Sequence, residues 1–283
     1  MRFVQLGSDE VPTLGLGTWR LGEAKRARTA EIAAVTTAIE IGYRLIDTAE
    51  MYGDGGAEEV VGAAVREAVR AGTVSRKDLT IVSKVLPSNA SRAGVLRACE
   101  RSLKRLQLDV IDLYLLHWPG SVPLKDTVTA FEQLRSEGRI RHWGVSNFDS
   151  TDMKQLWSLP AGSHCVANQV YYSASERGVE FDLLPWQRDN GVATMAYSPI
   201  DQGALARDTT FATIGRRHGV SASSAALAWV LRQPGMIAIP MSTSEPHLRE
   251  NFAASKVELS ADDLAQIDAR FPPPKRKRPL ATT

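Results

Sequence analysis

The sequence predicts a (β/α)8 barrel, the TIM-barrel fold, with an N-terminal β-hairpin closing the barrel floor. Apolar, strand-like stretches alternate with helical patterns from Leu14 to the end of the stretch 236–239. The strand-like stretches show little alternation of polar and apolar residues, which is typical of parallel strands buried on both faces. About eight such units are present, and eight is the number that closes a barrel.

The individual elements follow in order. Residues 2–6 and 10–12 flank the turn Gly7-Ser8-Asp9 and predict the hairpin. Strand-like stretches at 43–46, 79–83 and 110–116 are each followed by a helical pattern. The predicted helices cover residues 30–40, 58–69, 93–106, 127–137, 152–159, 182–188 and 222–232.

Bulk properties set the limits. The chain has 283 residues, of which 43% are hydrophobic, and this is ample for a buried core. No linker is long or polar enough to divide the chain, so we expect residues 1–283 to form a single domain. Lys and Arg total 34 against 32 for Asp and Glu, and a net charge of +2 gives no general field for capturing nucleic acid. The basic cluster 275–278 is interpreted as a solvated tail.

Cysteine use and hydropathy indicate the compartment. Cys99 and Cys165 are too few for a disulfide framework, and nothing around them suggests a metal pair, so we expect buried thiols and no metal. Residues 1–12 lack the continuous apolar stretch of a signal peptide, and no stretch reaches membrane-spanning length. We therefore expect a cytoplasmic protein without a membrane partner.

Polar residues lie where the predicted strands end. Asp47 directly follows one strand, Lys84 the next and His117 the one after, while Tyr52 lies one short loop beyond Asp47. Since the carboxyl ends of parallel barrel strands face a common mouth, these four side chains are expected to converge there. That arrangement is typical of an active site.

The same segments resemble the aldo-keto reductases over nearly the whole chain. The motifs that carry the resemblance are Gly15-Leu16-Gly17-Thr18-Trp19, Asp47-Thr48-Ala49-Glu50-Met51-Tyr52-Gly53, Ser83-Lys84-Val85, Leu116-His117-Trp118, Gly144-Val145-Ser146-Asn147-Phe148, Asn168-Gln169 and Ala196-Tyr197-Ser198-Pro199. Their order and spacing are highly specific, whereas any one of them alone would be weak. The resemblance implies a barrel enzyme that reduces carbonyl compounds with a nicotinamide nucleotide.

Tyr52 is the predicted proton donor, because a carbonyl that receives a hydride needs a proton on its oxygen. An unperturbed phenol titrates near pH ~10, and a cation about 4 Å away is worth on the order of 4 kcal/mol, or about three pKa units. We therefore expect Lys84 to lower the pKa of Tyr52. Asp47 is expected to keep Lys84 charged despite burial.

His117 and two tryptophans are expected to meet the substrate. By resemblance, His117 reaches the substrate oxygen, and a neutral imidazole donating one N–H would position it. Trp19 and Trp118 follow the first and fourth strands and are expected to form apolar walls of the carbonyl pocket. Tyr172 and Trp186 are interpreted as core residues.

By resemblance, the nicotinamide ring is clamped at the ends of the fifth, sixth and seventh strands. Ser146, Asn147 and Gln169 are expected to bind its carboxamide, and Tyr197 to stack on the ring. Ser198 and Ile239 are expected to contact the cofactor as well. A doubly wound dinucleotide fold is disfavoured because the stretch 15–22 misplaces the third glycine of the fingerprint and puts Trp where the helix should pack.

The segment 239–251 departs from the family. Many NADPH-specific members carry Lys directly after Ile-Pro and Arg a few residues on, whereas this chain has Met241 and His247 there. A predicted helix N-terminus remains as an anion site, together with the hydroxyls and adenine contacts that the resemblance implies: Ser242, Thr243, Ser244, Glu250 and Asn251. We expect NADPH as cofactor, and NADH stays open because of the two replacements.

The sequence therefore predicts a monomeric reductase of small aldehydes and ketones. The loop 118–123 is short and the tail after Phe271 is brief, so an open mouth is expected that suits methylglyoxal and aromatic aldehydes. Two alternatives remain. One is a nucleotide-binding barrel that acts mainly as a redox sensor or regulatory subunit, and the other is a barrel aldolase that forms a Schiff base at Lys84.

Overall fold

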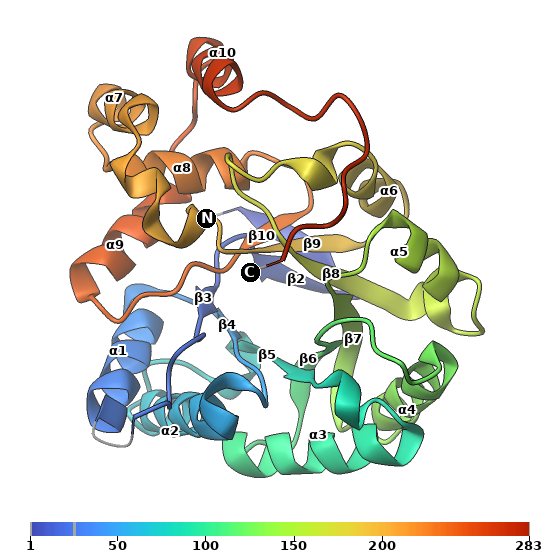
Figure 1. The fold of residues 1–283 in the computed structure, drawn as a ribbon. Coiled ribbons are helices and arrows are strands. Elements are labelled where there is room, and N and C mark those ends of the chain that lie inside the picture. The colour runs from blue at the N-terminus through green and yellow to red at the C-terminus, as the bar shows by residue number, and fades with distance from the viewer. Residues whose placement is uncertain (1, 25–26, 283) are drawn as a thin grey trace.

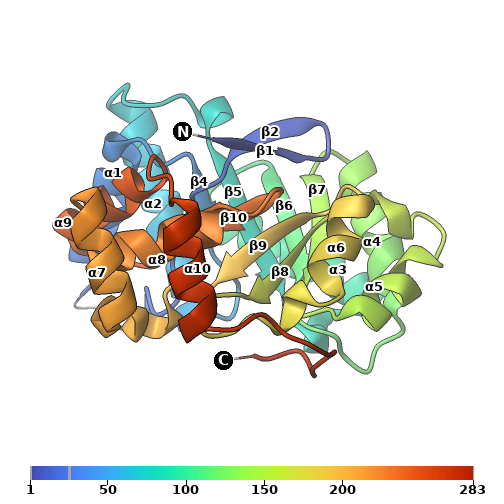
Figure 2. The same ribbon diagram turned by 90° about the horizontal axis from the view of Figure 1, so that it is seen from above.

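The computed structural model describes residues 2–24 and 27–282 of the chain, and its first element is the predicted hairpin. Strands β1 (Phe3–Leu6) and β2 (Asp9–Pro12) pair antiparallel, with Val4 opposite Val11. The hairpin lies across one end of the barrel (Figure 2). The prediction of an N-terminal hairpin is confirmed.

Within the described residues, eight parallel strands form the predicted barrel around a common axis (Figure 1). They are β3 (Leu16–Gly17), β4 (Leu45–Asp47), β5 (Thr80–Val85), β6 (Ile111–Leu116), β7 (Ile140–Ser146), β8 (Cys165–Tyr171), β9 (Ala193–Tyr197) and β10 (Met236–Ala238). Each strand pairs with the next in the chain. Bridges from Leu14 to Ala238 and from Gly17 to Met241 join the first strand to the last, which closes the barrel.

Helices surround the sheet. They are α1 (Arg28–Ile41), α2 (Gly56–Arg70), α3 (Arg92–Leu106), α4 (Leu124–Ser136), α5 (Ser150–Trp157), α6 (Leu183–Asp189), α7 (Thr209–His218), α8 (Ala222–Leu231), α9 (Glu245–Ala254) and α10 (Ala261–Arg270). The seven predicted helices are all present, with ends that differ by a few residues. Helices α7 and α10 were not predicted. Few of their side chains are both apolar and buried, namely Phe211 and Ile214 in α7 and Ile267 in α10.

Two layers of apolar side chains hold the barrel together. The larger cluster lies between the strands and the helices, and it includes Tyr172, which is fully buried. Trp186 is only partly buried and packs against this cluster. The second cluster fills the barrel interior, where Leu113 and Met195 meet Val11 of the hairpin. The hairpin therefore packs against the barrel interior from the floor.

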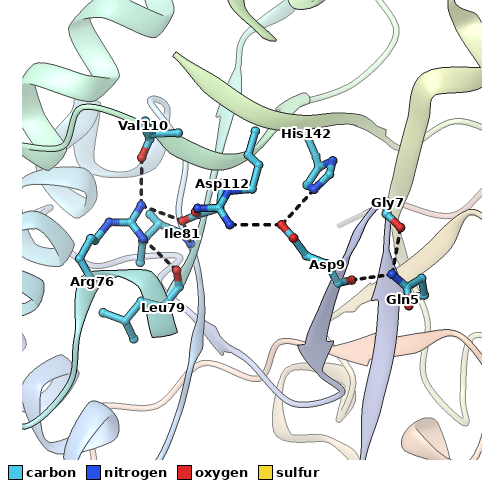
Figure 3. Close-up of polar contacts among 10 residues, drawn as sticks. Gln5, Gly7, Asp9, Arg76, Leu79, Ile81, Val110, Asp112 and His142 are labelled. Carbon is cyan, nitrogen blue, oxygen red and sulfur yellow. Dashed lines mark hydrogen bonds and ion pairs between the residues drawn. The ribbon is translucent and has the colours of Figure 1, made fainter. Parts of the chain in front are cut away.

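Charged contacts tie the hairpin to the barrel floor (Figure 3). Asp9 lies 3.1 Å from His142 Nε2 and 3.4 Å from the guanidinium of Arg141. Arg141 also approaches Asp112, which pairs with Arg76 at 2.8 Å. These contacts fix the hairpin as a plug, far from the mouth.

Residues 275–278 in the tail after α10 are exposed, as expected of a solvated segment, but Lys277 is also anchored to the barrel. Lys277 donates a hydrogen bond of 2.8 Å to Ser150 and lies 3.3 Å from Asp182 and 3.5 Å from Asp149. The tail then crosses toward the barrel mouth (Figure 1). The structure adds an anchor at Lys277, because two acidic residues distant in sequence lie where the tail passes.

Candidate active site

The four polar residues predicted at the strand ends lie together at the mouth of the barrel. Asp47 ends β4, Lys84 lies in β5, and His117 directly follows β6. Tyr52 opens the short 3-10 turn Tyr52–Gly55 after β4. Parallel pairing of β4 with β5 and of β5 with β6 places these strand ends side by side.

Lys84 is the centre of the group. Its Nζ atom donates to Asp47 Oδ2 at 2.7 Å, to the Thr48 carbonyl at 2.9 Å and to the Tyr52 hydroxyl at 3.1 Å. The side chain is fully buried, which alone would lower the pKa of the amine, but the contacts with Asp47 and Tyr52 outweigh burial and raise that pKa. Lys84 is therefore a charged ammonium group, as the sequence predicted.

The pKa of Tyr52 shifts in the direction opposite to our expectation. Burial raises the pKa, the Lys84 ammonium lowers it, and the Asp47 carboxylate raises it again. A cation alone would lower the pKa of the phenol, but the loss of water and the carboxylate behind the lysine both act against it. The net result is a phenol that stays protonated at neutral pH, which is the form that a proton donor requires.

His117 is a neutral imidazole. Burial and the nearby Lys84 ammonium lower its pKa to about 2, and the side chain is only 6% exposed. Its ring meets that of Tyr52 edge to face, with centroids 5.7 Å apart. Within the described part of the chain, Nδ1 is buried without a hydrogen-bond partner. The ring can thus offer a hydrogen bond next to Tyr52.

The four predicted clamp residues form one connected network at the ends of β7, β8 and β9. Ser146 Oγ donates to the Gln169 carbonyl at 2.9 Å and accepts from Asn147 Nδ2 at 3.1 Å. The Tyr197 hydroxyl donates to Asn147 Oδ1 at 2.9 Å. Gln169 Nε2 donates to Asp47 Oδ1 at 2.7 Å, which links the clamp to the ion pair. No local pattern in the sequence indicates this link.

A cavity of about 780 Å³ opens beside these residues. Tyr52, His117, Trp19 and Trp118 all line it, and the two tryptophans are 39% and 37% exposed. The cavity is also lined by predicted cofactor residues, namely Ser146, Asn147, Gln169, Tyr197, Ser198 and Ile239. One concave site therefore contains both groups of predicted residues.

Several lining residues were missed by the sequence reading. Arg20 and Met51 lie at the mouth, and the guanidinium of Arg20 stacks over the Trp19 ring at 4.4 Å. Thr282 also lines the cavity, so the tail reaches the mouth. The expectation that a brief tail would leave the mouth open on that side is wrong. No local pattern in the sequence points to Thr282, because its position depends on how the tail is anchored.

The predicted adenine end lies on the segment that follows β10. Met241 is 39% exposed in the cavity, and Ser244 immediately precedes α9, as the predicted helix N-terminus requires. In the described residues, no side chain caps this helix start, so the backbone N–H groups of Glu245 and His247 are available to an anion, whereas Pro246 has none. The expected contacts vary in exposure: Thr243, His247 and Glu250 are exposed, Ser242 is half-buried and Asn251 is buried.

Comparison with known proteins identifies the class. Residues 13–270 match the aldo/keto reductase family. This match and the barrel with its strand-end site show that the chain belongs to the aldo/keto reductase family and is an oxidoreductase of that family.

Individual relatives narrow the comparison. The chain is 45% identical to methylglyoxal reductase YeaE of Escherichia coli over 99% of this chain and 98% of that protein. It is 37% identical to glyoxal reductase of Bacillus subtilis over 92% of this chain and 89% of the relative. A crystal structure of an aldo-keto reductase from Klebsiella pneumoniae in complex with NADPH superimposes with a TM-score of 0.95 at 45% identity, covering 100% of this chain and 99% of the other.

Proposed function

We propose that this protein reduces small aldehydes and ketones to alcohols, with Tyr52 as the general acid. The observation that carries the proposal is the contact chain from Asp47 through Lys84 to Tyr52 beside a cavity with tryptophan walls. Relatives named methylglyoxal reductase and glyoxal reductase support small aldehydes as substrates.

The residues divide the chemistry among them. A bound nicotinamide nucleotide supplies the hydride that reaches the carbonyl carbon. The Tyr52 hydroxyl gives its proton to the carbonyl oxygen, and the Lys84 ammonium at 3.1 Å stabilises the phenolate that remains. His117 orients the oxygen by donating a hydrogen bond from its neutral ring. Trp19 and Trp118 exclude water from the reacting carbon.

Nucleotide binding is proposed for the connected network around Asn147. Ser146, Asn147 and Gln169 bind the carboxamide, and Tyr197 stacks on the ring. NADPH is the proposed cofactor, and the Klebsiella structures in complex with NADPH and with NADP support it. The exposed N-terminus of α9 receives the 2′-phosphate, with Met241 and His247 weakening the preference over NADH.

The aldolase alternative conflicts with the state of Lys84. A Schiff base requires a neutral amine that can attack a carbonyl, which usually means a lowered pKa. Lys84 is fully buried and donates to Asp47, Thr48 and Tyr52, and these contacts keep it protonated. The sensor alternative gains no specific support, because all four reacting groups are present and in contact. A cytoplasmic location stays a prediction, in keeping with the free buried thiols Cys99 and Cys165.

The deciding experiment is oxidation of NADPH and NADH in the presence of a panel of small carbonyl compounds. We expect loss of nicotinamide absorbance with methylglyoxal and aromatic aldehydes, faster with NADPH. Incubation of the protein with carbonyl compounds and borohydride serves as the companion assay. No oxidation with any carbonyl, together with a trapped adduct at Lys84, would favour the aldolase instead.

A further inference from the structure

The loop that follows β9 has an unusual backbone. Ser198, Asp201 and Gln202 have φ values of 48°, 51° and 48°, and Gly203 follows at 92°. Left-handed conformations are uncommon for residues other than glycine, and they persist only where the surroundings determine them. All residues of the segment 198–203 except Asp201 line the active-site cavity. The segment thus presents a strained backbone to the proposed nucleotide site.

Asp201 explains how this backbone is held. The Tyr171 hydroxyl donates to Asp201 Oδ1 at 2.5 Å, and Ser175 Oγ donates to Oδ2 at 2.8 Å. Hydrogen bonds to a carboxylate are short and about twice as strong as neutral ones. Burial and the bond to Asp201 raise the pKa of Tyr171, so its phenol stays protonated and able to donate. Ser175 is exposed, whereas Tyr171 is half-buried.

Tyr171 has a second role on its ring face. It ends β8 and is the register partner of Tyr197 at the end of β9. The two rings are nearly parallel, at 15°, with centroids 5.8 Å apart. Tyr197 in turn donates to Asn147 in the proposed nicotinamide clamp. Tyr171 therefore contacts both the clamp and the strained loop, although it does not line the cavity itself.

We propose that Tyr171 and Asp201 are positioning residues that hold residues 198–203 in the conformation that binds the nucleotide. This proposal rests on the proposed function of the cavity. When only a fraction of the molecules has the competent loop, the measured Kd rises by the inverse of that fraction. Loss of the Tyr171–Asp201 bond therefore weakens nucleotide binding without removing any group that touches the nucleotide or the carbonyl.

The test is Tyr171→Phe, which keeps the ring stack with Tyr197 and removes only the hydroxyl. We expect the Kd for NADPH to rise roughly 10-fold, because the lost bond ends on a carboxylate while backbone hydrogen bonds within residues 198–204 still hold part of the loop. Nucleotide dissociation, followed by stopped-flow fluorescence, should be faster. Hydride transfer in a single turnover at saturating NADPH should stay within about 2-fold of the parent protein, because the reacting groups are untouched.

Two further variants sharpen the result. Ser175→Ala removes the exposed bond to the same carboxylate and should raise the Kd less than about 3-fold. Asp201→Ala should weaken binding at least as much as Tyr171→Phe. The double variant Tyr171→Phe with Asp201→Ala should bind NADPH no more weakly than Asp201→Ala alone, because both substitutions remove the same bond.

Other outcomes overturn the proposal in distinguishable ways. Suppose that the parent protein binds NADPH and that the Tyr171→Phe variant binds it equally well, with an unchanged circular dichroism spectrum. The positioning role of Tyr171 and Asp201 is then refuted and the proposed function stands. If hydride transfer slows while the Kd is unchanged, Tyr171 acts through Tyr197 and not through the loop. If the parent protein binds neither NADPH nor NADH, both the proposed function and the positioning role of Tyr171 and Asp201 are refuted.

Discussion

At the scale of single residues, the site depends on one buried cation between two acidic groups. Lys84 Nζ lies between the Asp47 carboxylate and the Tyr52 hydroxyl, at 2.7 Å and 3.1 Å. A buried charge is costly unless it is paired and hydrogen-bonded, and Lys84 has three such partners. Each of the three side chains therefore depends on the other two.

Removing the hydroxyl of Tyr52 tests the proton donor. Tyr52→Phe should reduce turnover by about 10²–10⁴-fold, since that is the usual contribution of a general acid, while the Kd for NADPH changes little. The measurement is steady-state carbonyl reduction together with fluorescence titration of the nucleotide. Tyr114→Phe is the control, because Tyr114 lies in β6 with its side chain fully buried between the strands and the helices, away from the cavity. Retention of more than half of the turnover by Tyr52→Phe would refute the assignment.

Removing the cation should be comparably damaging. Lys84→Met leaves the Asp47 carboxylate buried beside the Tyr52 hydroxyl, so turnover should fall by about 10²-fold or more. Breaking a buried ion pair typically costs about 3–5 kcal/mol, so the free energy of unfolding should fall as well. Urea denaturation and turnover are measured on the same preparation. Unchanged turnover in this variant would remove the role given to Lys84.

The lowered pKa of His117 predicts how the free energy of unfolding depends on pH. Its pKa falls from 6.5 to about 2 on folding, so below pH 6.5 the unfolded chain binds a proton that the folded protein does not. The stability that His117 contributes is therefore complete above pH 6.5 and is lost as pH falls, by at most about 1.4 kcal/mol per pH unit. Between pH 6.5 and 5, the free energy of unfolding measured by urea denaturation should fall by roughly 1–2 kcal/mol less for His117→Asn than for the parent protein. Equal losses in both proteins would show that His117 does not titrate in this way.

At the scale of elements, the proposed site residues lie near the carboxyl ends of the strands or in the segments that follow them, including α9. Parallel pairing brings residues from β4, β5, β7 and β8 within hydrogen-bonding distance of one another. The hairpin closes the opposite end, where Val4, Leu6 and Val11 belong to the same buried cluster as the barrel interior. In the proposed function, the N-terminus of α9 extends the site beyond β10 and gives the preference between NADPH and NADH a separate structural basis.

Substitutions at Met241 and His247 test whether the start of α9 sets the preference between NADPH and NADH. His247→Arg, and more so Met241→Lys with His247→Arg, should tighten NADPH binding about 10-fold or more, because charged hydrogen bonds are worth roughly 1.5–3 kcal/mol each. NADH lacks the 2′-phosphate, so its Kd should hardly change. Fluorescence titration with both nucleotides provides the measurement. Equal tightening of the two, or no change in either, would show that this segment does not contact the 2′-phosphate.

At the scale of the whole molecule, the chain is a barrel sealed below and partly covered above. No helix in residues 2–24 and 27–282 is long and apolar enough to cross a membrane. The tail is anchored through Lys277 and ends beside the cavity at Thr282. The mouth is therefore shaped by both ends of the barrel sequence, from Trp19 to Thr282.

We expect one domain and a monomer. Sedimentation at micromolar concentration should give a single species near 30.9 kDa, and calorimetry should give one cooperative transition. The physical reason is the continuous core that joins the helices to all sides of the sheet. A species of twice that mass, or two separated transitions, would contradict these predictions.

The sequence by itself determined the fold, because the spacing of apolar stretches and helical patterns repeats around the whole barrel. It also determined that Asp47, Lys84 and His117 share a mouth, since parallel strands end at the same face. Helices α7 and α10 were not predicted, although each has a buried apolar face, with Phe211 and Ile214 in α7 and Ile267 in α10. The barrel and the family are confirmed, whereas the roles of the site residues stay predictions.

Only the tertiary structure decided how these groups influence one another. Gln169 reaches Asp47 across 122 positions of sequence, and the tail returns to the mouth through Lys277. The direction of the Tyr52 pKa depends on burial and on Asp47 behind the cation, neither of which is encoded locally. Hydrogen-bond partners and the loss of water are properties of the packed molecule, so residue spacing alone could not supply them.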